Sequence, residues 1–448
     1  MEMETAVDND RERYRRDIRM RIVKLNGETK KNILGDLLKR SPNNYGEYEE
    51  TVNGIIEQVR ERGDQALFDF TRQFDKCEMT AENLAVTRAE IEEAYRTLDE
   101  ELIETMKRSA ENIRAYHEKQ IRQSFFATKP DGSILGQRIT PLRRAGVYVP
   151  GGKAAYPSSV LMNVVPAKVA GVEEIVMTTP PGKDGKVNPG TLVAADIAGV
   201  DRIYKVGGAQ AIAAMAFGTE SIPKVDKITG PGNIFVALAK KAVFGYVSID
   251  SVAGPSEILI LADRHANPRY AAADLLSQAE HDELASAILI TDSMELAEKV
   301  SEEVEQFTGQ LSREEIIRKS LDNYGYILVA ENMDEAVEAA NDIASEHMEI
   351  LTRDPFQTMT KVKNAGAIFL GEYSSEPLGD YFAGPNHILP TNGTAKFFSP
   401  LGVDDFIKKT SVISYSREAL LRDHEDIERL AKSEGLTAHA NSVAVRFQ

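Results

Sequence analysis

Residues 174–211, EIVMTTPPGKDGKVNPGTLVAADIAGVDRIYKVGGAQA, decide the fold class of this chain. The segment opens with a short apolar run that ends in a Pro-Gly turn, which is typical of a buried strand. An alanine-rich stretch of helical length follows, and a second apolar run then enters a Gly-Gly pair and another helical stretch. Strands that alternate with helices in this way predict a parallel sheet with crossover helices.

The same alternation continues on both sides of this segment. AGVYVPGG at 145–152 predicts a buried strand that runs into a glycine turn, and 270–281 predicts a helix. Further strands are predicted at 256–263, 286–292, 324–332 and 365–371. We therefore expect an α/β protein with two α/β units. Periodicity does not fix where one unit stops, or whether the chain leaves one unit, builds the other and returns.

The two ends of the chain differ from this pattern. Residues 1–45 are polar and highly charged, which predicts an arm followed by a helix. Long helical patterns follow, one through 92–121 and one in 55–75 with apolar residues on one face, namely Ile55, Val59, Leu67, Phe68 and Phe70. The last stretch, 403–448, is again polar and is predicted to be helical. Six arginines between Arg11 and Arg21 indicate a solvated helix face or an arm that packs on a partner subunit.

Composition excludes several classes of function. The 448 residues include 70 acidic and 53 basic side chains, so the net charge of -17 argues against nucleic-acid binding, which needs a basic face. The single cysteine, Cys77, permits no intramolecular disulfide, which fits a reducing cytoplasm. No signal peptide and no apolar run approaching a membrane span is visible, so we expect a cytoplasmic protein without a membrane partner.

Four of the seven histidines lie in segments rich in other polar residues: His281, His347, His387 and His439. The other three, His117, His265 and His424, are interpreted as ordinary surface or core residues. Gln278 and His281 are three apart in a helical pattern and share a face. Histidine and carboxylates are common zinc ligands whereas glutamine is rare, so spacing alone favours Glu280 or Asp282 as the partner of His281.

Glu346 and His347 are adjacent, and neighbours on a regular helix diverge by about 100°. At a helix end or in a loop they could line one pocket; the alternative is an exposed helix terminus. Two glycine turns, at 206–211 and 229–233, could approach a phosphate, although neither is GxGxxG and a tight turn with positive φ explains each equally well. Cys77 lies in a charged, amphipathic stretch that we interpret as surface, so it is not expected to be a nucleophile.

Several segments taken together resemble the histidinol dehydrogenase family, and they occur in that family's order from about residue 45 to the end. They are RAGVYVPGGKAAYPSSVLMN, VGGAQAIAAMAFGTESIPKVDKITGPGNIFV, SVAGPSEILILAD, DLLSQAEHD, SEHMEILT, GDYFAGPNHILPT and EGLTAHANSV. The resemblance implies one zinc ion per subunit, held by Gln278, His281, Asp380 and His439. In that family the imidazole and amino nitrogens of histidinol complete the coordination, which is a template role for the metal.

The resemblance also assigns the catalytic and binding residues. His347 would take the hydroxyl proton while hydride passes to NAD, and Glu346 would activate the water that adds to the aldehyde. The zinc ligands and His347 would also contact the substrate, together with Ser256, His387 and Glu434, of which Glu434 would hydrogen-bond the imidazole. The positions that match NAD contacts are Tyr148, Gln210 and Asn233.

The fold implied by the resemblance has two incomplete Rossmann-like domains, similar to aldehyde dehydrogenases, with small helical N- and C-terminal extensions. We expect a helical arm over 1–45, an NAD-binding α/β domain over 145–255, and a second α/β domain, carrying most of the active site, from 46–144 plus 256–402. The extension 403–448 would reach the partner of a homodimer, and Glu434 and His439 would act across the interface.

The implied reaction is the oxidation of L-histidinol through its aldehyde to L-histidine, the last steps of histidine biosynthesis, with two NAD reduced. A related zinc and NAD dehydrogenase of another primary alcohol, such as a sulfonated diol, is the alternative, and it would need no partner for an imidazole. A zinc-bound structural or binding protein that has lost catalysis is a third hypothesis, which the intact pair Glu346 and His347 disfavours.

Overall fold

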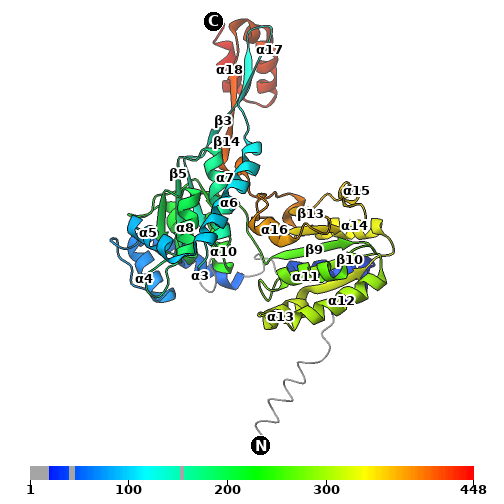
Figure 1. Cartoon of the computed structure of the whole chain (residues 1–448). Helices are drawn as coiled ribbons and strands as arrows, with labels where there is room; N and C mark the ends of the chain where they lie inside the picture. The colour runs from blue at the N-terminus through cyan, green and yellow to red at the C-terminus, as the bar shows by residue number, and fades with distance from the viewer. Residues whose placement is uncertain (1–19, 40–45, 152–155) are drawn as a thin grey trace, which may run out of the picture.

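The computed structural model describes residues 20–39, 46–151 and 156–448, which form two parallel sheets and one antiparallel sheet (Figure 1). Each parallel sheet is the centre of one lobe, and the antiparallel sheet forms a projecting extension. The predicted α/β class, with two α/β units, is confirmed. Among the described residues, no helix is both long and apolar enough to cross a membrane.

The first lobe is built on a five-stranded parallel sheet with the order β6-β5-β4-β7-β8. Since β4 is first along the chain, the order of the strands reverses between β4 and β7, and ligands of such sheets bind at the carboxyl ends of the strands near this point. The strands are β4 (Arg144–Tyr148), β5 (Glu174–Thr179), β6 (Arg202–Lys205), β7 (Lys227–Thr229) and β8 (Ser248–Ile249), and the helices between them are α7 (Pro157–Ala170), α8 (Pro189–Ala198), α9 (Gly208–Phe217) and α10 (Ile234–Val243).

Residues 46–117, which precede this sheet along the chain, form four α-helices: α3 (Gly46–Arg62), α4 (Asp64–Phe74), α5 (Arg88–Thr97) and α6 (Glu100–His117). The single helix predicted over 55–75 is therefore two helices, separated at Gly63, where φ is 54°. A side chain at Gly63 would collide with the carboxylate of Glu220, so the break needs glycine. The helix predicted over 92–121 is likewise divided, because the Asp99 side chain accepts the Leu102 N–H and begins α6.

The packing of these helices differs from the expected division into domains. Leu67 of α4 lies in one core with Met215, and Ile113 of α6 lies in another with Val147, so residues 46–117 belong to the first lobe and not with 256–402. Both faces of a parallel sheet must be covered, and these amphipathic helices extend the cover of the first sheet. Their sequences predict a buried face, but they do not predict which of the two sheets that face packs against.

The second lobe contains a six-stranded parallel sheet with the order β1-β11-β10-β9-β12-β13. Its strands are β1 (Arg21–Lys24), β9 (Glu257–Ala262), β10 (Ser286–Thr291), β11 (Gly325–Val329), β12 (His347–Leu351) and β13 (Ala367–Leu370). Its helices are α2 (Gly27–Lys39), α11 (Pro268–Ala279), α12 (Met294–Thr308), α13 (Glu314–Tyr324), α14 (Met333–Ile343), α15 (Pro355–Met359) and α16 (Glu376–Tyr381), followed by the 3-10 turn η3 (Thr394–Lys396).

The expected N-terminal arm is part of this second lobe wherever the structure describes it. β1 pairs with β11, and α2 buries Ile33 and Leu37 against the sheet, because an edge strand and an apolar helix face are both stabilised by this contact. The arginine-rich segment lies mostly in residues 1–19, which are outside the described residues.

The extension combines a three-stranded antiparallel sheet with two helices and projects away from the first lobe (Figure 1). It comprises β2 (Phe125–Thr128), β3 (Ile134–Pro141), β14 (Ile407–Ser414), α17 (Arg417–Ser433) and α18 (Thr437–Ala444), with the 3-10 turns η2 (Glu118–Gln120) and η4 (Val403–Phe406) at its base. The purely helical prediction for 403–448 missed β14. Much of this strand is exposed, so it lacks the apolar alternation of a half-buried strand.

The packing of α6 can be tested with Ile113→Ala. The Ile113 side chain is fully buried in the first lobe, so its loss should cost about 2–5 kcal/mol of unfolding free energy. Hydrogen exchange should then lose protection first in β4 and β5, whereas the control Ile327→Ala in β11 should affect β9 and β10. Loss of protection in β9 and β10 on Ile113→Ala would support the division expected from sequence instead.

Candidate active site

The predicted catalytic pair lies at the amino edge of the six-stranded sheet. His347 is the first residue of β12, opposite Ile258 of β9 and Ala367 of β13. Glu346 and His347 are only 7% and 3% exposed, so the interpretation as an exposed helix terminus is wrong. The pair lies where a loop leads into β12, and at this position both side chains are buried.

Glu346, His347 and Asp380 form a buried chain of charged groups. Glu346 Oε2 lies 3.8 Å from His347 Nδ1, and Asp380 Oδ1 lies 3.6 Å from His347 Nε2. The backbone of Glu257 orients two of these groups: its N–H donates to Glu346 Oε2 at 2.9 Å, and its carbonyl lies 3.1 Å from His347 Nδ1. With Nδ1–H donating to that carbonyl, the neutral imidazole has its lone pair at Nε2.

This arrangement changes the proton affinity of all three groups. Burial raises the pKa of Glu346 to about 8. Burial disfavours the charged form of His347, but the carboxylates of Glu346 and Asp380 outweigh it and raise the pKa of His347 to about 10. Burial also disfavours ionised Asp380, whereas His347 and His387 stabilise its carboxylate and lower its pKa to about 2. His347 is thus a strong proton acceptor.

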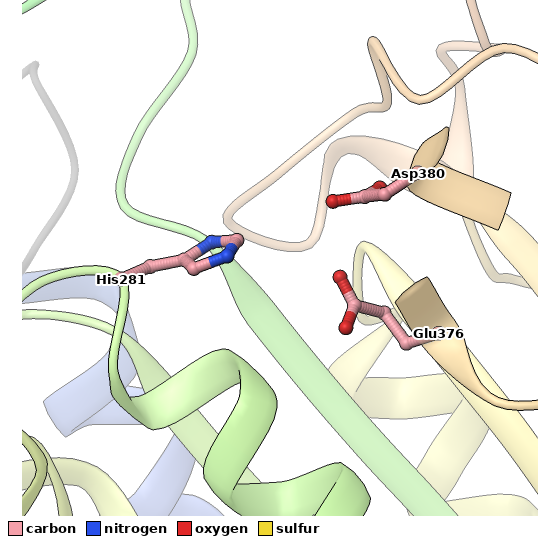
Figure 2. A group of neighbouring side chains, drawn as sticks. All are labelled: His281, Glu376 and Asp380. Carbon is pink, nitrogen blue, oxygen red and sulfur yellow. The ribbon is translucent and has the colours of Figure 1, made fainter. Parts of the chain in front are cut away.

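A cluster of potential metal ligands lies beside Glu346 and His347, and it shares Asp380 with them. His281 follows α11, whereas Glu376 and Asp380 are four residues apart on one face of α16. One ligand atom from each residue lies within 4.8 Å of the others, and Figure 2 shows the imidazole facing both carboxylates. Glu376 was missed by the sequence analysis, although its spacing from Asp380 is a signal that could have found it.

Gln278 lies beside this cluster, at the end of α11. Its side chain is fully buried, and its Nε2 lies 3.4 Å from His281 Nδ1. Within the described residues, three buried atoms here make no hydrogen bond: Gln278 Oε1, His347 Nε2 and Glu376 Oε1. Buried polar atoms need partners, and this set of nitrogen and oxygen donors suits zinc. Glu280 and Asp282, which spacing alone favoured, are not in the cluster.

A cavity of about 320 Å³ lies next to these residues and is lined in part by His347, Asp380 and His387. His387 Nδ1 lies 3.1 Å from the Asp380 carbonyl oxygen, and its Nε2 lies 3.5 Å from Ser159 Oγ on α7 of the first lobe. Burial lowers the pKa of His387, which favours a neutral ring. Ser256 directly precedes β9, and its carbonyl accepts the Ser286 N–H at the same edge.

The three positions expected to contact NAD lie at the carboxyl edge of the first sheet. Tyr148 ends β4 and its hydroxyl accepts the Gly208 N–H at 3.2 Å, while Gln210 is buried in α9. Asn233 begins α10 by accepting the N–H groups of two residues of its first turn. Both glycine turns have positive φ, 68° at Gly208 and 117° at Gly230, so the tight-turn interpretation is confirmed.

Three residues lie apart from the site within this chain. Glu434 and His439 are exposed in the extension, and Figure 1 shows α17 and α18 far from α16. Cys77 is buried rather than on the surface, and burial raises the pKa of its thiol, which agrees with the expectation that it is not a nucleophile.

Comparison with known proteins identifies the family. A family model described as histidinol dehydrogenase matches residues 38–447. The chain belongs to the histidinol dehydrogenase family. The histidinol dehydrogenase of Halalkalibacterium halodurans is 60% identical over 397 residues, covering 89% of this chain and 93% of that protein. The histidinol dehydrogenase of Bacillus subtilis is 58% identical over 400 residues, with the same coverage.

A solved structure of a histidinol dehydrogenase, from Elizabethkingia anophelis, has the same overall fold. It superposes with a TM-score of 0.90 at 36% identity and covers 96% of this chain and 98% of that one. The resemblance to the histidinol dehydrogenase family that the sequence motifs suggested is confirmed, and membership makes the protein an oxidoreductase of the dehydrogenase class.

The candidate metal site can be tested with Asp380→Asn. Loss of one anionic ligand should lower the affinity of the metal-free protein for Zn²⁺ by at least about tenfold, measured by competition with a chelating dye. Asp282→Asn is the matched control, because Asp282 lies one residue after His281 but outside the cluster. Equal affinities of the two variants would mean that Asp380 is not a ligand.

Proposed function

We propose that this protein oxidises L-histidinol through its aldehyde to L-histidine in two NAD-dependent steps, the last steps of histidine biosynthesis. The buried chain Glu346–His347–Asp380 beside a cluster of nitrogen and oxygen ligands carries the proposal. Alcohol oxidation needs a base at the hydroxyl, and aldehyde oxidation needs a second base for water. The site offers one of each.

The residues that would hold zinc are Gln278, His281 and Asp380, with His439 supplied by a second subunit. When bound, the ion would serve as a template for the imidazole and amino nitrogens of the substrate, and NAD would accept hydride. Glu376 lies in the same cluster, and Ser277 Oγ donates to its Oε2 at 2.8 Å. This contact fixes the Glu376 carboxyl group in the candidate cluster, beside Asp380.

His347 is the base of the first oxidation. Its Nδ1 is engaged by the Glu257 carbonyl, so Nε2 takes the proton of the substrate hydroxyl while the carbinol C–H leaves as hydride to NAD. Glu346 and Asp380 stabilise the imidazolium that results. A cation held by Asp380 would offset part of that carboxylate's charge, which keeps the imidazole neutral before the proton arrives.

Glu346 is the base of the second oxidation. It takes a proton from the water that adds to the aldehyde carbon, and the hydrate then loses its C–H as a second hydride to NAD. Burial raises the pKa of Glu346 to about 8, so this carboxylate is a far better base than an exposed glutamate. Water attack also agrees with the surroundings of Cys77, which is buried beside Gly185 of the first lobe.

NAD is proposed to bind at the carboxyl edge of the first sheet. Tyr148 and the turns carrying Gln210 and Asn233 meet there, where the order of strands reverses between β4 and β7. The N-termini of α9 and α10 face the same edge and favour the cofactor's pyrophosphate.

A homodimer is proposed because α18, which carries His439, and α17, which Glu434 directly follows, lie far from α16, which carries Asp380 (Figure 1). The extension exposes several large apolar side chains, namely Ile413, Leu421, Ile427, Leu430, Leu436 and Val445. A group of exposed apolar residues of this kind marks a protein interface. Each active site would then need both subunits.

The substrate test compares L-histidinol with a sulfonated diol on the zinc-loaded protein. L-histidinol should be the better substrate, and Glu434→Gln should raise its KM by about tenfold, because a charged hydrogen bond to the imidazole is weakened. Faster turnover of the diol, or an unchanged KM, would favour the alternative dehydrogenase. A protein that has lost catalysis would reduce no NAD, and His347→Asn would change nothing.

Subunit mixing tests the shared site. Glu346→Gln and His439→Ala should each be inactive alone, because each damages every site of its own homodimer. Mixed and allowed to exchange subunits, they should recover part of the activity, since a heterodimer contains one site with both native residues. No recovery despite exchange, proven by mass spectrometry, would place both residues in a site formed by a single chain.

A further inference from the structure

A buried ion pair, Lys240 and Asp250, hydrogen-bonds to the turn that follows β7. The Gly230 N–H donates to Asp250 Oδ2 at 2.8 Å, and Lys240 Nζ donates to the Gly230 carbonyl at 2.9 Å. Lys240 and Asp250 also form an ion pair with each other. Both polar groups of one glycine are therefore held by two oppositely charged side chains.

This pair is unusual in its burial. The side chains of Lys240 and Asp250 are only 3% and 5% exposed. Removing two charges from water is expensive, and an apolar pair of similar volume is often no less stable. A pair retained in this place is better explained by the geometry that it imposes on Gly230 than by stability.

The turn that carries Gly230 connects β7 to α10 and lies against β4 in the first lobe. Gly230 has a φ of 117°, and a side chain there would collide with the carbonyl oxygen of Tyr148 at the end of β4. The turn thus lies directly against β4, at the point where the order of strands reverses. Three residues later Asn233 begins α10, so the position of Gly230 sets the direction of that helix N-terminus.

Asp250 also begins the linker to the second lobe. Its N–H donates to the Ile228 carbonyl at 3.2 Å, and further along the linker the Gly254 N–H donates to Thr391 Oγ1 at 2.8 Å. The linker ends at Ser256, at the amino edge of the second sheet. The Asp250 carboxylate therefore contacts the turn at the carboxyl edge of the first sheet, and the Asp250 backbone begins the linker that leads to the candidate active site.

We propose that Lys240 and Asp250 are positioning residues for the dinucleotide: the pair holds the 229–233 turn in the conformation that cofactor binding requires. This inference rests on the proposed binding of NAD at the carboxyl edge of the first sheet. Within the turn the pair contacts the N–H and the carbonyl of Gly230, and Asp250 also accepts the Ser251 N–H, so we expect it to act on the cofactor through the backbone of the turn.

The test uses the full-length protein and two readouts, the Kd of NADH by fluorescence titration and the separate KM values of NAD and L-histidinol. Lys240→Met removes the hydrogen bond to the Gly230 carbonyl. The double variant Lys240→Met/Asp250→Asn removes it without leaving an unpaired buried charge. Lys227→Met is the matched control, because Lys227 is a similarly buried lysine of the same lobe, paired with Asp405 at the other end of β7.

The double variant should bind NADH about tenfold more weakly, and its KM for NAD should rise by a similar factor. Its KM for L-histidinol should change less than about twofold. Lys227→Met should leave NADH binding unchanged even if it lowers Tm equally. Unchanged NADH binding in the folded double variant, with weaker binding in Asn233→Ala, would overturn the positioning role alone. Unchanged binding in both variants would overturn the proposed cofactor site as well.

Discussion

The hydrogen bonds that the backbone of Glu257 makes to Glu346 and His347 are the constraint on which the candidate active site depends. They exist because β9 and β12 are neighbours in a parallel sheet, with His347 opposite Ile258. One peptide group donates to the carboxylate and the carbonyl of the same residue engages the imidazole. A central pair of strands thereby fixes the protonation geometry of two adjacent side chains, which rigid elements do better than loops.

The two lobes use opposite edges of their sheets. In the first lobe the glycine turns and Tyr148 lie at the carboxyl ends of the strands, as the general rule for α/β sheets predicts. In the second lobe His347 begins its strand, and Ser256 directly precedes β9, so the candidate chemistry lies at the amino ends. The linker from β8 to β9 joins one edge to the other, and it connects the candidate active site with the edge proposed to bind the cofactor.

Much of the fold could be predicted because the relevant strands are continuous apolar runs. β9 and β10 are buried along their whole length, and both were predicted from sequence. β12 was missed, since it begins with His347 and contains Glu349, and both residues are buried for reasons that only the neighbouring strands reveal. The helices of 46–117 were predicted, but the sheet they cover was not, because an amphipathic pattern does not name its partner.

The same limit applies to the site. Gln278 and His281 were predicted to share a helix face, but α11 ends at Ala279 and His281 lies just beyond it. Spacing alone favoured Glu280 or Asp282 as the second ligand, and only the motif set pointed to Asp380. Glu376 was not foreseen, although it faces Asp380 across one turn of α16 (Figure 2). α11 and α16 are far apart in sequence but contact each other directly, for example through the hydrogen bond from Ser277 to Glu376, and local sequence does not encode this contact.

The most direct test of the account is the yield of NADH per L-histidinol consumed by the zinc-loaded protein, with histidine quantified at the end. Two NADH and one histidine per substrate are expected, because one site supplies a base for the alcohol and a base for water. One NADH with accumulating aldehyde would contradict the role of Glu346, and no turnover would contradict the proposed substrate.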